Sequence, residues 1–117
     1  MRDIFNQLVN NLNQNHVIKP LLRREAFVMK VDSGDCFLYL ELKNGVFSLL
    51  PKADGHTILI KGNRKSLESV LEGRVLLRRA KKEKDVEVFS SLRKLLLLES
   101  ILHLVNVNEQ AWSQSFS

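Results

Sequence analysis

Residues 85–105 read DVEVFSSLRKLLLLESILHLV, and this stretch joins two patterns of different period. The segment DVEVF alternates between apolar and polar residues, which predicts a β-strand. Ser90 or Ser91 can cap the helix that follows. In that helix the consecutive leucines 95–98 cover the whole circumference, so we expect apolar neighbours on more than one side. Those neighbours could be core, lipid or another chain.

The residues before this stretch predict a further strand and a short amphipathic helix. The strand is HTILIKG at 56–62, and Asn63 can cap the helix after it. Apolar positions of this helix follow at spacings of three and four: Leu67, Val70 and Leu71. Gly73 can close the helix because glycine readily adopts the left-handed conformation that ends many helices.

Two hairpins are predicted further upstream, joined by turn residues. The strands are EAFVMKV at 25–31, DCFLYLELK at 35–43 and VFSLL at 46–50. The turns are Ser33-Gly34-Asp35 and Asn44-Gly45, of which the second is a strong hairpin signal. In the middle strand the core-facing set is Cys36, Leu38, Leu40 and Leu42, so we expect a buried thiol at Cys36.

The order of these elements predicts an α+β fold. An amphipathic helix over residues 3–14 precedes the strands, and hairpins imply mostly antiparallel pairing. We therefore expect a five-stranded, mostly antiparallel sheet with the helices packed on one face. The predicted organisation is one domain over residues 1–107, followed by a C-terminal tail over residues 108–117 that shows no pattern and contains Trp112.

Composition is that of a globular protein with a basic surface. The chain has 117 residues, 44% of them hydrophobic and 26% charged, with a net charge of +5. The leucine-rich run is too short to span a bilayer, which takes about 20 apolar residues. The start of the sequence lacks the continuous apolar stretch of a secretory signal, and the single cysteine suits a reducing compartment. We therefore expect a cytoplasmic protein.

Catalytic motifs are not evident in the sequence. His16, His56 and His103 show no metal-ligand spacing with one another, and there is no glycine-rich phosphate loop or nucleophile elbow. We expect a protein that is not an enzyme, with no cofactor and no metal site, and we expect His103 to face water.

The stretch KADGHTILIKGNRKSLESVLEGRVLLRRAKKEKDVEVFSSLRKLL, residues 52–96, resembles the sterol carrier protein type 2 family of small lipid-binding domains. The matching positions are Leu42-Lys43-Asn44-Gly45, Lys52-Ala53-Asp54, Leu71, Gly73, Ala80, Val86, Val88 and Leu92. From Gly73 onward the spacing has no gap. The chain departs from the family pattern at Leu38, Leu77, Lys84 and Ser90-Ser91, which bears on the cavity entrance and the ligand.

This resemblance implies a sterol-carrier-like fold with an apolar tunnel between sheet and helices. The tunnel would hold a fatty acyl chain, an acyl thioester or a sterol-like lipid, and burial of a long alkyl chain is favourable by about 25 cal/mol per Å². The expected lining residues are Leu67, Leu71, Val86, Val88, Leu92, Leu95, Leu96 and Ile101. Such a tunnel would give the leucine helix its second apolar environment.

The basic run between positions 74 and 84 predicts contact with an anionic membrane surface during unloading. The expected contact residues are Arg74, Arg78, Arg79, Lys81 and Lys82, with Val75, Leu76 and Leu77 as possible anchors. Each Lys or Arg near an anionic bilayer contributes about 1 kcal/mol.

Two other classes of function stay open. The leucine helix could be covered by a protein partner or by a second copy of the chain, which would make the domain a dimerisation module with a filled core. The other class is a basic protein that binds nucleic acid without sequence preference, although no groove-reading or base-stacking motif accompanies the charge.

Overall fold

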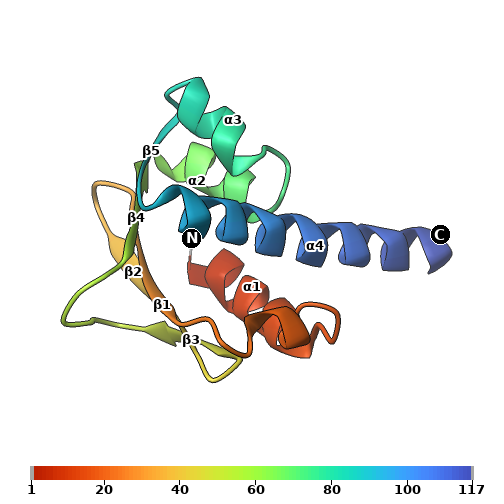
Figure 1. Ribbon diagram of the computed structural model, residues 1–117. Coiled ribbons are helices and arrows are strands. Elements are labelled where there is room, and N and C mark those ends of the chain that lie inside the picture. The colour runs from red at the N-terminus through yellow and green to blue at the C-terminus, as the bar shows by residue number, and fades with distance from the viewer. Residues whose placement is uncertain (1, 117) are drawn as a thin grey trace.

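The computed structural model describes the backbone of residues 2–116 and the side chains of residues 3–20 and 22–106. Five strands form one sheet: β1 Phe27–Asp32, β2 Phe37–Lys43, β3 Val46–Leu50, β4 Ile58–Gly62 and β5 Val86–Phe89. The helices are α1 Arg2–Gln14, the 3₁₀ turn Lys19–Leu22, α2 Arg64–Leu71, α3 Leu77–Lys82 and α4 Leu92–Phe116. Helices α1 and α4 lie on the same side of the sheet (Figure 1).

The sheet has the strand order β3-β2-β1-β4-β5. Neighbouring strands pair antiparallel except β1 and β4, which pair parallel with Met29 opposite Ile58. The β2–β3 turn uses Asn44 and Gly45, both with positive φ (54° and 77°), as a two-residue hairpin loop favours. The predicted α+β fold with a mostly antiparallel five-stranded sheet is therefore confirmed.

The core lies between the sheet and the helices. Alternate residues of each strand point to the helical side, as the period of two requires. The buried strand residues include Met29, Val31, Leu40, Leu42, Ile58 and Ile60. Helix α1 contributes Phe5, Leu8 and Leu12 to the same cluster. The sheet and its helices thus share one apolar layer.

In helix α4 the apolar side chains form one buried stripe, and two leucines lie outside it in exposed positions. The buried residues recur at spacings of three and four: Leu95, Leu98, Ile101, Leu102 and Val105. Leu92 and Leu96 are 68% and 38% exposed. The core therefore supplies apolar neighbours on one side of α4 only, and Leu92 and Leu96 have no such cover among the described residues.

One expectation at the end of a strand needs correction. The predicted buried thiol at Cys36 is wrong, because Cys36 precedes β2 and is exposed, 3.3 Å from the Ser33 hydroxyl. Helix α4 extends to Phe116, into the segment 108–117 that we expect as a C-terminal tail, and the domain boundary after residue 107 stays a prediction. The Trp112 side chain lies outside the described residues. None of the described helices is long and apolar enough to cross a membrane.

Candidate ligand-binding site

The segment from α2 to α3 is held by well-defined helix ends. The Asn63 side chain accepts a hydrogen bond from the backbone N–H of Ser66 at 2.8 Å and so caps α2. At the other end Gly73 has φ +77° and donates its N–H to Val70 O, while Arg74 N–H bonds to Ser69 O. This pair of bonds is the Schellman pattern, which confirms the predicted closing role of Gly73.

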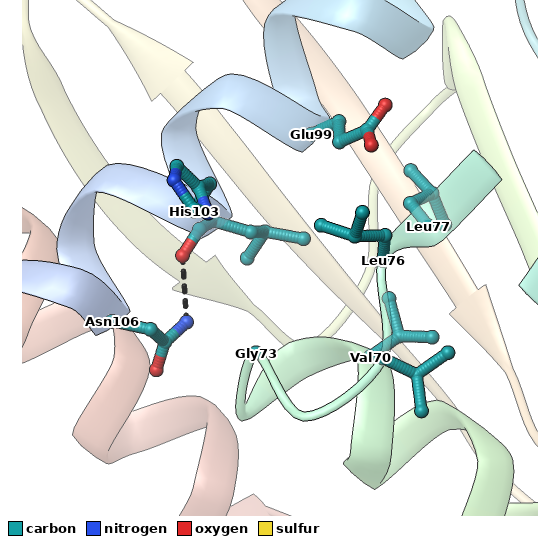
Figure 2. A pocket seen from close by; sticks show the side chains of 9 residues that line it. Val70, Gly73, Leu76, Leu77, Glu99, His103 and Asn106 are labelled. Carbon is teal, nitrogen blue, oxygen red and sulfur yellow. Dashed lines mark hydrogen bonds between the residues drawn. The ribbon is translucent and has the colours of Figure 1, made fainter. Parts of the chain in front are cut away.

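Gly73 brings the end of α2 against α4. A Cβ atom added at Gly73 would lie 2.6 Å from Cγ of Asn106, so a larger residue does not fit without movement. The Asn106 amide donates to the carbonyl oxygen of Leu102 at 2.7 Å (Figure 2). The backbone at Gly73, just after α2, therefore packs directly against the Asn106 side chain of α4, and the hydrogen bond to Leu102 holds that side chain in place.

A cavity of about 230 Å³ lies beside this contact, between the α2–α3 turn and α4. Its apolar lining comes from Val70, Val75, Leu76, Leu77 and Leu102, and its polar lining from Glu99, His103 and Asn106, with Gly73 at one side. Figure 2 shows Leu76 and Leu77 opposite Glu99 and His103 across this space. An apolar cavity with a few convergent polar groups is typical of a small-molecule site.

An open groove of about 570 Å³ adjoins this cavity and shares Leu76 and Glu99 with it. Its other lining residues, Arg78, Arg79, Lys82 and Glu83, belong to α3 or its end. The cavity alone is smaller than the 300–1,000 Å³ that ligand pockets usually occupy, whereas the cavity and the groove together fall within that range. The groove beside the cavity is therefore lined by three basic and two acidic side chains.

Glu99 stands where the cavity and the groove meet. The residue is 8% exposed, and its Oε2 atom accepts a hydrogen bond from Nε of Arg78. The Arg78 side chain is 60% exposed, so the carboxylate is enclosed while its partner reaches solvent. A buried carboxylate without such a partner would be strongly unfavourable.

The predicted tunnel residues fall into two groups. Six lie in the core: Leu67, Leu71, Val86, Val88, Leu95 and Ile101. The other two, Leu92 and Leu96, are exposed on α4. None of the eight lines the cavity of about 230 Å³. The cavity thus lies beside the layer in which the tunnel was expected.

The predicted membrane-contact residues are all exposed. Arg74 lies in the turn, and Arg78, Arg79, Lys81 and Lys82 lie on α3. Arg74 and Arg79 form ion pairs with Glu72 and Glu83, each at 3.2 Å. Of the proposed anchors, Leu76 is 49% exposed, but Leu77 is buried in the core and cannot serve.

Sequence reasoning missed Glu99 and Asn106 as site residues. His103 is exposed, as expected, but it also lines the cavity. Glu99, His103 and Asn106 follow one another at spacings of four and three, so they share one face of α4. That polar stripe within a leucine-rich helix was the available signal. The described residues contain no group of three or more His, Cys, Asp or Glu able to hold a metal.

Comparisons with known proteins bear on the fold. No family model matches the sequence, and no curated protein matches it. The solved structure of a ubiquinone synthesis protein, UbiJ-SCP2, superposes with a TM-score of 0.72 at 16% identity, covering 91% of this chain and 90% of that one. The crystal structure of a sterol carrier protein 2 superposes with a TM-score of 0.61 at 12% identity, covering 89% of this chain and 94% of that one.

Two further structures extend this likeness. Sterol carrier protein 2 from Yarrowia lipolytica gives a TM-score of 0.59 at 17% identity, covering 85% of this chain and 86% of that one. The sec-alkylsulfatase Pisa1 from Pseudomonas sp. gives 0.56 at 18% identity over 65% of this chain, which spans only 13% of the sulfatase. The expected resemblance is confirmed at the level of architecture: this chain has the sterol carrier protein 2 fold.

Proposed function

We propose that the chain is a non-catalytic lipid-binding domain that holds the apolar part of a lipid between the α2–α3 turn and α4. The observation that carries the proposal is the apolar cavity of about 230 Å³, which adjoins the groove lined by α3 residues. Each 100 Å² of apolar surface that a ligand buries there would contribute about 2.5 kcal/mol. Affinity of this kind needs few specific polar contacts.

The fold supports an apolar cargo. Proteins of this architecture include ones named for carrying sterols and for ubiquinone synthesis. An alkyl chain longer than the cavity would have to enter the layer between sheet and helices, where Leu67, Leu95 and Ile101 lie. The six buried members of the predicted tunnel set therefore stay part of the proposal, as contacts for the remainder of a fatty acyl chain, acyl thioester or sterol-like ligand.

Mass spectrometry tests this function directly. The purified protein is extracted with denaturing organic solvent, and its native mass is measured in parallel. We expect a stoichiometric lipid that is released on unfolding and absent from a control protein of similar charge. A protein that is empty and also takes up neither an added long-chain alcohol nor an added fatty acid would contradict the proposal.

The basic residues on α3 are proposed to contact an anionic membrane when the ligand is unloaded. The triple variant Arg79→Gln, Lys81→Gln, Lys82→Gln keeps the Arg78–Glu99 pair intact. Since each cation contributes about 1 kcal/mol, we expect roughly 100-fold weaker binding to phosphatidylserine-containing vesicles. Cosedimentation with vesicles measures the binding, and a fluorescence transfer assay measures the unloading rate.

A matched control removes the same charge elsewhere. Lys43, Lys52 and Lys61 are exposed and lie away from α3 in the chain. Their triple replacement by glutamine should weaken vesicle binding much less, because these cations are not gathered beside the groove. Equal losses in the two variants would show that net charge alone, and not the α3 surface, attracts the membrane.

A second candidate function is protein–protein interaction through the uncovered face of the sheet. Phe37 and Phe89 are about half exposed there, and Phe37 packs edge-on against Tyr39 at 5.8 Å with Lys30 Nζ 4.5 Å above its ring. Exposed apolar area of this kind often marks an interface. Sedimentation velocity over a concentration series would detect self-association, which the double variant Phe37→Ser, Phe89→Ser should abolish.

A further inference from the structure

Glu99 is the only buried charged residue among those whose side chains are described. It lies at the edge of the apolar stripe of α4, beside Leu98 and Leu102, both of which are buried in the core. An apolar residue at this position would stabilise the helix packing without the desolvation of a carboxylate. Stability of the fold therefore gives no reason for an acidic residue here, and a ligand would.

The Glu99 carboxylate has one oxygen available to a ligand. Oε2 accepts the hydrogen bond from Arg78, and no group of the described residues donates a hydrogen bond to Oε1. No fully buried side-chain oxygen or nitrogen in that part of the chain lacks a hydrogen bond. Oε1 must therefore reach open space, and the open space that Glu99 lines is the cavity and its adjoining groove.

An ionised carboxylate only accepts hydrogen bonds. A ligand hydroxyl can donate to Oε1, and a hydrogen bond to a charged group is worth more than one between neutral groups. A ligand carboxylate brought to the same place would put two like charges close together, which is unfavourable. Arg78 could attract that anion, but its guanidinium reaches solvent and would hold the head group outside the cavity.

We infer that Glu99 is the head-group acceptor of this cavity, and that the cavity selects apolar ligands ending in an uncharged hydroxyl over those ending in a carboxylate. This inference rests on the proposed lipid-binding function and names the ligand class for that same site. The two charged residues then have separate roles: Glu99 accepts a hydrogen bond from the ligand's head group, and Arg78 neutralises the buried carboxylate.

Two probes of equal chain length test the selectivity. Dodecanol and dodecanoate bury the same alkyl chain, so the ratio of their dissociation constants at pH 8 isolates the head group. We expect the unaltered protein to bind dodecanol at least about tenfold more tightly. In Glu99→Gln the like charge is gone, so the ratio should shift at least about tenfold toward dodecanoate. Displacement of a fluorescent apolar probe measures both constants.

Ser100→Ala is the control, because Ser100 is exposed on the same helix and lines neither space. Its ratio should equal that of the unaltered protein. Equal binding of the two probes by the unaltered protein would overturn the inference even if no variant folds, and so would a ratio that Glu99→Gln leaves unchanged. Either result would leave lipid binding standing. Failure to bind either probe would overturn both the inference and the proposed function.

Discussion

Replacing Leu98 with alanine is expected to lower the free energy of unfolding by about 2–5 kcal/mol, the range for buried leucines in well-packed cores. Leu98 is 2% exposed and lies in the buried stripe of α4. Truncation would leave a cavity between α4 and the apolar layer that the sheet supplies, because the surrounding side chains can relax only in part. Urea denaturation followed by circular dichroism measures the change.

The same helix offers a matched control in Leu92→Ala. Leu92 is 68% exposed, so its truncation removes few contacts, and we expect a change within about 0.5 kcal/mol. Both substitutions remove the same side-chain atoms, so a large difference between them reports burial. Similar losses at the two positions would mean that Leu92 is covered in solution, for example by a second copy of the chain.

Gly73→Ala is expected to have the second largest effect on stability and to lower the free energy of unfolding by about 2 kcal/mol or more. The substitution combines two unfavourable terms. Gly73 has φ +77°, which costs a non-glycine residue roughly 1–2 kcal/mol, and the new Cβ would lie 2.6 Å from Asn106. Asn106 is held by its bond to Leu102, so the end of α2 has to move away from α4.

Alanine substitutions at two other glycines distinguish the cost of the positive φ from the cost of the steric contact. Gly34 has φ +94° with nothing within 4 Å of an added Cβ, so Gly34→Ala measures the backbone cost alone. Gly55 has the same open space without the positive φ and should tolerate alanine. Thermal and urea unfolding of the three variants should rank Gly73 as most sensitive. A loss at Gly73 no greater than at Gly34 would show that Asn106 gives way freely.

Local patterns predicted the secondary structure well where one physical cause dominated. The Asn44-Gly45 turn requires positive φ at both residues, and few other residue types allow it. Alternation in β2 placed Leu38, Leu40 and Leu42 in the core, and only Cys36 failed, because it lies one residue before the strand begins. Errors at element ends are expected, since a single residue there has no periodic neighbours to define its side.

The leucine run shows the limit of a local pattern. Four adjacent leucines indicate an apolar helix but not which of them meets the core, because every face of the helix is apolar. Packing against the sheet buried Leu95 and Leu98 and left Leu96 exposed. Periodicity therefore predicted that α4 exists, while its orientation depended on contacts with residues distant in the chain.

The sequence by itself determined the strands, the turns, the capped helix and the basic surface, because each follows from interactions between residues close together in the chain. Only the tertiary structure decided the parallel pairing of β1 with β4 and the site at Glu99. Arg78 precedes Glu99 by 21 residues, and Gly73 precedes Asn106 by 33. No local pattern encodes such pairs, since they form only when the α2–α3 turn packs against α4.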